Sequence, residues 1–139
     1  SHSGNLSVYD KSFQNVWNKP IGSKNTPLVS GGSVFVFDNS GILYALNVKN
    51  GKLRWKNIFQ VKTITGYFFD KKTLITFKGP FLVGNKILLF NSEGTMFVIN
   101  PDNGLVEKKI KIGQIATSPL SFTNEMILLF SNGKISSYN

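Results

Sequence analysis

Few residues of this 139-residue chain could perform nucleophilic, acid–base or metal chemistry. Its single histidine, His2, stands in the start Ser1-His2-Ser3, which indicates a processed or engineered N-terminus and offers no plausible catalytic imidazole or imidazole metal ligand. The absence of cysteine excludes a disulfide scaffold, a thiolate metal site and a cysteine nucleophile. Gly31-Gly32 precedes an expected strand and so lacks the strand–loop–helix context of a phosphate-binding loop.

Carboxylates remain as candidate calcium ligands or general bases. There are seven: Asp10, Asp38, Asp70, Glu93, Asp102, Glu107 and Glu125. Four fall in expected turns, Asp70 falls in an expected insertion, and the last two flank expected strands. Asn47 and Asn100 recur at one repeat position, which favours turn-forming side chains over ligands. The sequence therefore predicts no catalytic, cofactor-binding or metal-binding residue.

Composition indicates a globular domain, with 41% hydrophobic and 17% charged residues and a net charge of +9. The 15 lysines and one arginine are scattered, which argues against nucleic acid as a partner. A solvated basic surface is the simpler interpretation, and an anionic partner stays open. No apolar run reaches about 18 residues, and Ser1 to Asn5 lacks the features of a signal peptide.

The elements that carry these residues repeat along the chain. Three prolines are each followed fourteen residues later by a glycine, in the pairs Pro27 and Gly41, Pro80 and Gly94, and Pro119 and Gly133. Six residues after each of these glycines stands an asparagine, and Gly4 with Asp10 extends the series. In the two complete copies a second glycine follows ten residues after the first, as Gly51 and Gly104. Such a period predicts a repeat architecture.

Each copy is expected to contain short strands. The predicted strands are Asn5–Tyr9, Ser33–Phe37, Ile42–Leu46, Lys52–Lys56, Lys86–Phe90, Thr95–Ile99, Leu105–Ile110, Glu125–Phe130 and Lys134–Tyr138, with Pro27, Pro80 and Pro119 opening the innermost strands. Several runs are continuously apolar, which suggests strands covered on both faces. The unit is a four-stranded antiparallel meander of about forty residues, so the fold class is all-β with β-propeller blades.

The middle repeat interval is longer than the others. It carries an insertion of roughly fourteen residues within 58–78, which contains Tyr67, Phe68 and Phe69. A hairpin added to the blade edge is the preferred interpretation, and an irregular partner-binding loop is the alternative. Exposed aromatic side chains here would be partner contacts.

The stretch from Gly41 through Tyr44-Ala45-Leu46 and Gly51 to Trp55 resembles the repeat of pyrroloquinoline-quinone (PQQ) type β-propellers. The resemblance extends more weakly over the chain, because Gly4 to Trp17 lacks the second glycine and Lys108 stands where a tryptophan belongs. It implies that Trp17 and Trp55 dock neighbouring blades, which their equivalent repeat positions also favour over ligand stacking.

Two functional groups share this repeat. The quinone-dependent dehydrogenases use it around a calcium-bound cofactor, and BamB-like outer membrane protein assembly factors use it as a docking surface. The chain shows no cofactor site and no vicinal cysteine pair, so a non-catalytic BamB-like scaffold, not an enzyme, is favoured. The alternatives are a fragment of a PQQ-dependent dehydrogenase whose active site lies outside this chain and, less favoured, a sensor or carbohydrate-binding propeller.

The strand count is thirteen, or about three blades, in one partial domain over 1–139 with blade parts 4–20, 27–57, 79–112 and 117–139. Closed propellers need at least four blades. We therefore expect the C-terminal part of a longer, periplasmic, outer membrane-associated protein whose signal and lipid anchor are not in this chain. Its expected partners are the outer membrane assembly machinery and a second copy of itself.

Overall fold

The computed structural model describes residues 4–59, 75–112, 120–122, 127–131 and 134–138. Thirteen strands lie in these residues, distributed over four sheets of two, four, four and three strands, as the sequence predicts. In this described part no helix is long and apolar enough to cross a membrane.

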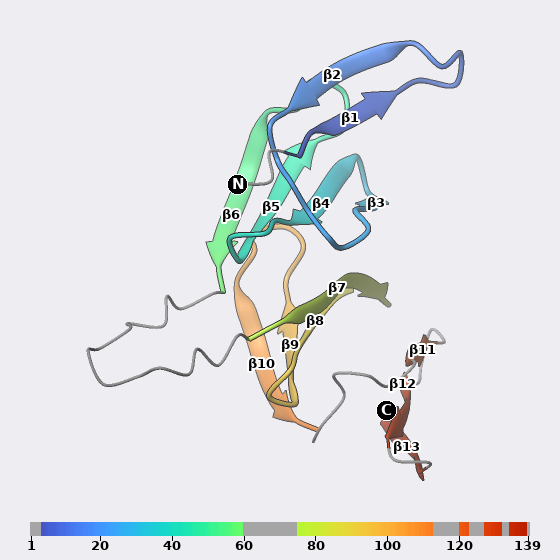
Figure 1. The fold of residues 1–139 in the computed structure, drawn as a ribbon, viewed down its shortest axis with the longest axis vertical. Coiled ribbons are helices and arrows are strands. Elements are labelled where there is room, and N and C mark those ends of the chain that lie inside the picture. The colour runs from blue at the N-terminus through green and yellow to red at the C-terminus, as the bar shows by residue number, and fades with distance from the viewer. Residues whose placement is uncertain (1–3, 60–74, 113–119, 123–126, 132–133, 139) are drawn as a thin grey trace, which may run out of the picture.

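Each sheet is an antiparallel meander of strands that follow one another in the chain. The first sheet contains β1 (Leu6–Tyr9) and β2 (Asn15–Lys19), and the second contains β3 (Leu28–Ser30), β4 (Ser33–Phe37), β5 (Ile42–Asn47) and β6 (Leu53–Ile58). The third contains β7 (Phe77–Val83), β8 (Lys86–Asn91), β9 (Thr95–Ile99) and β10 (Val106–Lys111), and the fourth contains β11 (Leu120–Phe122), β12 (Ile127–Ser131) and β13 (Lys134–Tyr138). The chain is an all-β partial propeller, and its first three sheets follow one another in Figure 1.

Several strand boundaries differ from the sequence prediction by one or two residues, and the boundary at Pro80 differs by three. Pro27 directly precedes β3, but Pro80 does not open its strand, because β7 already begins at Phe77. The pairing of β7 with β8 shifts register between Lys78 and Phe81. A proline, which has no N–H to donate, is tolerated within a strand at such an irregularity.

Some predicted features lie outside the described residues. These are Tyr67, Phe68, Phe69, Asp70, Pro119, Glu125, Gly133 and Asn139. The hairpin proposed for the insertion therefore stays a prediction.

The repeated Asx residues form turns, as predicted. The side-chain oxygens of Asp10, Asn47 and Asn100 each accept a 2.8 Å hydrogen bond from the backbone N–H two residues later; the donors are Ser12, Lys49 and Asp102. Similar turns join β4 to β5 and β8 to β9, and Asp10, which also accepts a bond from the N–H of Gln14, shares their hydrogen-bond pattern. In these turns Asp38 and Asn91 each accept bonds from the N–H groups two and four residues later. Such local bonds hold the chain in the turn between strands.

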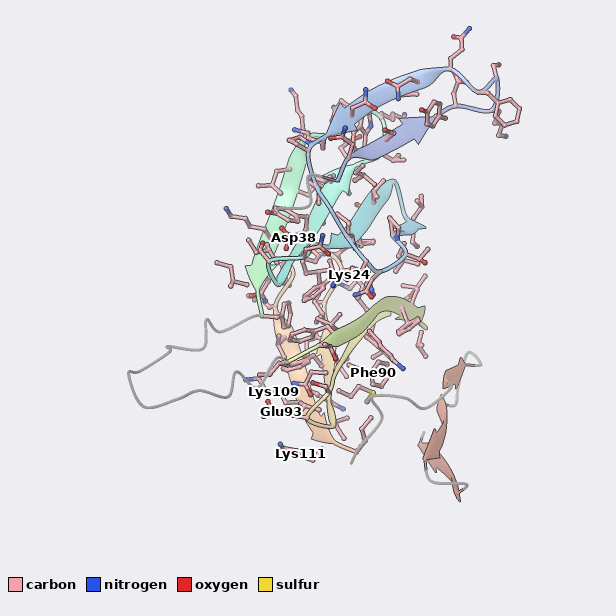
Figure 2. The ribbon with its side chains drawn as sticks, in the orientation of Figure 1. Lys24, Asp38, Phe90, Glu93, Lys109 and Lys111 are labelled. Atoms are coloured by element: carbon pink, nitrogen blue, oxygen red, sulfur yellow. The ribbon has the colours of Figure 1, made fainter. Side chains whose placement is uncertain are left out.

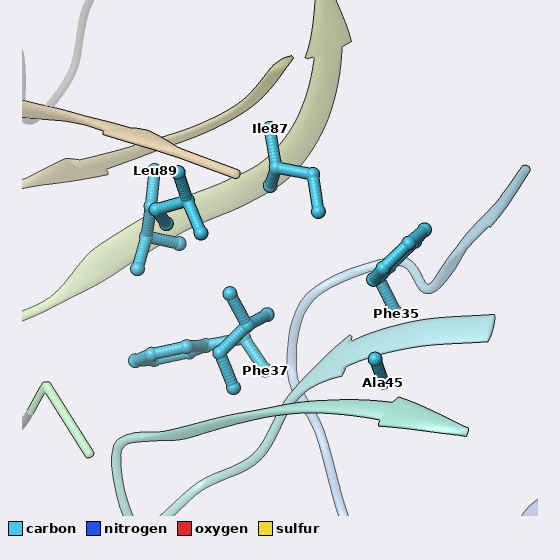
Figure 3. Packing of buried hydrophobic residues seen from close by; sticks show 7 residues of the cluster. Phe35, Phe37, Ala45, Ile87 and Leu89 are labelled. Atoms are coloured by element: carbon cyan, nitrogen blue, oxygen red, sulfur yellow. The ribbon is translucent and has the colours of Figure 1, made fainter. Parts of the chain in front are cut away.

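The core lies between the sheets. Successive residues of a strand point to opposite faces, and β4 is buried on both: Val34 and Val36 pack toward the first sheet, whereas Phe35 and Phe37 pack toward the third. Figure 3 shows Phe35 and Phe37 facing residues from β8 across the seam between the second and third sheets. This confirms for β4 that a continuously apolar run is a strand covered on both faces, and β8 shows the same, with Ile87 and Leu89 in one cluster and Leu88 and Phe90 in another.

Candidate functional site

The seam between the second and third sheets is where outer-strand side chains from one repeat meet turns of the next. Trp55, on β6, donates a hydrogen bond of 2.8 Å from Nε1 to the carbonyl of Pro101 in the β9–β10 turn. Asn57, two residues later on the same face, donates a 2.8 Å bond to the carbonyl of Gly104. The outer half of the seam is therefore closed by polar contacts as well as by packing.

The seam between the first and second sheets repeats this geometry. Trp17, on β2, donates a 2.7 Å bond from Nε1 to the carbonyl of Val48 in the β5–β6 turn. Both indole rings are half-buried, and each joins the core cluster of its own seam. These contacts support the docking role that the repeat positions predict for Trp17 and Trp55.

Each indole lies against a glycine with positive φ, Gly51 at +73° and Gly104 at +77°. A Cβ atom at Gly51 would lie 2.8 Å from Cδ2 of Trp17, and one at Gly104 would lie 2.6 Å from Cδ2 of Trp55. The second glycine of the repeat is thus required by its backbone conformation and by the close approach of the ring.

Lys108 takes the equivalent position on β10, and its side chain is exposed. An ammonium group cannot supply the packing of an indole, so the tryptophan contact made by the first two sheets has no counterpart at this residue.

Five of the seven carboxylates that the sequence offered for chemistry lie in the described residues, and they are dispersed. Oδ1 of Asp10 and of Asp38 accepts backbone bonds in turns, and Glu93 and Asp102 are exposed. Within the described ranges, no group of three or more acidic, histidine or cysteine side chains could hold a metal ion. Asp10 and Asp38 thus stabilise turns, and Glu107 forms an ion pair with Lys86.

Two ionisable side chains have perturbed environments. Burial raises the pKa of Tyr44 above its ordinary value, and the Asp38 carboxylate, which accepts a hydrogen bond from the phenol, raises this pKa further. A hydrogen bond from Lys86 lowers the pKa of Glu107, whose carboxylate lies 2.6 Å from the ammonium group. Asn100 also donates to Glu107, at 3.3 Å. The first arrangement links β5 to the β4–β5 turn, and the second links β10 to β8 across β9; Asp38 and Glu107 also line surface hollows.

Several surface hollows lie along the seam between the second and third sheets, and two of them contain charged side chains of the outer strands. One, of about 360 Å³, lies among hairpin tips and contains Arg54, whose Nη1 donates a 2.8 Å bond to Oγ of Ser33. The other, of about 520 Å³, lies at the outer rim and is called the rim groove below. Its lining includes Ile58 and Phe59 at the end of β6, Phe97 of β9, and Lys108 and Lys109 of β10.

Sequence reasoning identified the two tryptophans and missed the groups that they contact. The acceptors are backbone carbonyls, whose residue type carries no signal. The rim groove was also missed, because its lining comes from segments far apart in the chain. Asn57 carried a weak signal, since it stands two residues after the docking tryptophan and shares its face.

Comparisons with known proteins agree with this geometry. A family model described as "Outer membrane protein assembly factor BamB" matches residues 1–57. The chain is 26% identical over 137 residues to the protein of that name from Moranella endobia, and 22% identical over 138 residues to that of Escherichia coli. Each alignment covers 97% of this chain and 32% of the relative. The chain thus spans about a third of the length of these curated relatives.

Solved structures show the same fold. The crystal structure of BamB from Moraxella catarrhalis superposes with a TM-score of 0.69 at 19% identity, covering 99% of this chain and 41% of that one. The computationally designed Ika4 protein superposes with a TM-score of 0.63 at 13% identity, covering 98% of this chain and 79% of that one. The chain is thus similar to BamB proteins in sequence, most clearly over residues 1–57, and shares the propeller fold of these solved structures.

Proposed function

We propose that this chain is a non-catalytic, protein-binding part of an outer membrane protein assembly factor. The observation that carries the proposal is the similarity to BamB proteins along 97% of the chain. The dispersed carboxylates support a docking role, because a quinone-dependent dehydrogenase needs several oxygen ligands and a base gathered at one cofactor.

The proposed setting is the periplasmic side of the outer membrane, and the proposed partners are components of the machinery that assembles β-barrel proteins there. Residues 1–139 would be one partial propeller domain within a longer protein. Tyr67, Phe68 and Phe69, which lie outside the described residues, are proposed as further partner contacts. The free edge of β1, which pairs with β2 alone among the described strands, would favour self-association of the isolated chain.

Crosslinking in cells tests the proposal. A photoreactive amino acid is placed at exposed positions of the complete protein that contains this chain, and the adducts are identified by mass spectrometry. We expect adducts with named components of the assembly machinery. Adducts confined to redox enzymes, or none with the machinery, would contradict the scaffold function.

A titration tests the enzymatic alternative on the same complete protein. Pyrroloquinoline quinone is added with Ca²⁺, and binding is followed by fluorescence. We expect no saturable binding, and saturable binding with alcohol or sugar oxidation would overturn the proposal.

A further inference from the structure

The rim groove has a rigid apolar floor. Phe59 and Phe97 meet there at a centroid distance of 5.4 Å with nearly perpendicular rings. The backbone N–H of Phe59 donates a 2.8 Å bond to the carbonyl of Gly41, which ties the end of β6 to the start of β5. Val106 packs against the same core cluster. Side chains held in this way offer a preformed surface, which lowers the entropic cost of binding.

One wall of the groove is apolar and exposed. Ile58 lines the groove, yet 65% of its surface is exposed. An isoleucine that contributes this little to the core can contribute to binding, because its apolar surface is still available for burial by a partner.

The opposite wall is cationic. Lys108 and Lys109 line it, and Nζ of Lys109 lies 6.0 Å from the centroid of the Phe97 ring. Glu107 also lines the groove, but its carboxylate is paired with Lys86. The groove therefore presents the ammonium group of Lys109 near the Phe97 ring, and Lys108 adds a second positive charge to its lining.

The outer strands as a group share this charge. Across β2, β6 and β10 the basic residues outnumber the acidic Glu107; they are Lys19, Arg54, Lys56, Lys108, Lys109 and Lys111. Lys109 and Lys111 can be followed on β10 in Figure 2. Lysines on an edge strand commonly prevent unwanted strand pairing, but that role does not require an aromatic floor beneath them.

We propose that the rim groove binds an extended segment of a partner protein in which apolar side chains alternate with carboxylates. The apolar side chains would cover Phe97 and Ile58, and the carboxylates would pair with Lys108 and Lys109. Alternation suits an extended segment, whose successive side chains point to opposite sides. The lysines beside the apolar floor match a segment that carries both carboxylates and apolar side chains. The inference rests on the proposed scaffold function and adds the chemistry of the partner.

Fluorescence anisotropy with three labelled eight-residue peptides tests this inference. The peptides alternate phenylalanine with aspartate, phenylalanine with lysine, or serine with aspartate. We expect the first to bind about tenfold more tightly than either of the others, and more weakly as salt rises. Equal binding of the phenylalanine–aspartate and serine–aspartate peptides would overturn the inference, because the floor would then be irrelevant.

Matched variants locate the binding. K108E/K109E should weaken binding of the phenylalanine–aspartate peptide about tenfold or more, whereas K49E/K52E, with the same charge change at exposed lysines of the β5–β6 turn, should change it about twofold or less. Ile58→Asp should weaken it about fivefold, and Leu53→Asp, at an exposed site on the same strand outside the groove, should not. Equal losses in groove and control variants would overturn the inference.

Two further measurements separate the other occupants and the proposed function. Vesicles that contain phosphatidylglycerol test whether the groove binds a lipid surface. If they compete with the peptide for the unaltered protein and do not bind K108E/K109E, a lipid surface is the occupant and the inference is overturned. A crosslink between position 109 and another residue of the same chain that blocks peptide binding would show that the chain itself covers the groove. This result would also overturn the inference.

The complete protein separates the inference from the proposed function. If K108E/K109E crosslinks to the assembly machinery as well as the unaltered protein does, the inference about the groove is overturned and the scaffold function stands. Lack of crosslinking by the unaltered protein would instead count against the scaffold function, and the peptide results would then decide the groove alone.

Discussion

The indole of Trp55 and the backbone of Gly104 belong to different sheets and lie in direct contact. The ring covers a glycine with φ of +77°, and its Nε1–H reaches the carbonyl of Pro101 in the same turn. Trp17 has the same relationship to Gly51. The repeat therefore encodes a contact between successive sheets rather than a feature within one sheet.

Substituting Gly104 tests this contact. Gly104→Ala should lower the free energy of unfolding by about 2–5 kcal/mol, because positive φ is costly for alanine and the new Cβ would overlap Trp55. Gly84→Ala is the matched control, since Gly84 also has positive φ, +59°, but its Cβ would meet nothing within 4 Å. Its cost should be about 1–2 kcal/mol. Urea denaturation measures both, and equal costs would show that the ring does not press on Gly104.

Removing the indole N–H tests the hydrogen bond separately from the packing. Trp55→Phe should cost about 1–2 kcal/mol, since the Pro101 carbonyl loses its donor and part of the ring is lost. Trp55→Ala should cost about 3–5 kcal/mol because the packing is lost as well. Trp17→Phe should resemble Trp55→Phe in chemical denaturation. A neutral effect of both phenylalanine variants would mean that the indole bonds contribute nothing to stability.

Alkaline pH should weaken the β4–β5 turn through Tyr44. Its pKa is raised by burial and by Asp38, so the folded chain holds the phenolic proton more tightly than the unfolded chain does. The stabilisation is fully present below about pH 10, the ordinary value, and is lost as pH rises through the raised pKa. Stability measured from pH 8 to 11 should therefore fall more steeply for the unaltered chain than for Tyr44→Phe. Parallel curves would refute the assignment.

Acid pH should act on Glu107 in the opposite sense. Its pKa is lowered chiefly by the hydrogen bond from Lys86, so its contribution is present above the ordinary carboxyl value and is lost as pH falls through the lowered pKa. NMR titration of the side-chain carboxyl carbon measures this pKa, which should rise in Lys86→Met. The effect on stability should be small because both side chains are partly exposed to solvent, which screens the ion pair. No change of pKa in the variant would assign the shift to another group.

Repetition made much of the fold predictable from sequence. Gly51 and Gly104 recur at one position because the tryptophan contact recurs, and Asn47 and Asn100 recur because the same turn is built twice. Thirteen strands and their distribution among sheets follow from that period. Pro80 was misplaced because the irregularity at Gly79-Pro80 depends on pairing with β8, which residue type does not reveal.

The candidate site was less predictable for a similar reason. Ile58, Phe97 and Lys109 look like ordinary strand residues, and their meeting at one groove depends on how the second sheet packs against the third. The arginine–serine bond between Arg54 and Ser33 joins residues 21 positions apart and likewise follows from strand pairing. Local patterns predict strands and turns, whereas surface hollows arise from packing between them.

The scaffold function is tested most directly by deleting the gene for the complete protein in its source cells. The measurement is the amount of folded β-barrel protein in the outer membrane, assayed by resistance to denaturation in unheated gel samples. We expect a loss of folded barrels that is restored by the unaltered gene, with no change in quinone-dependent oxidation. Normal barrel assembly together with lost dehydrogenase activity would contradict it.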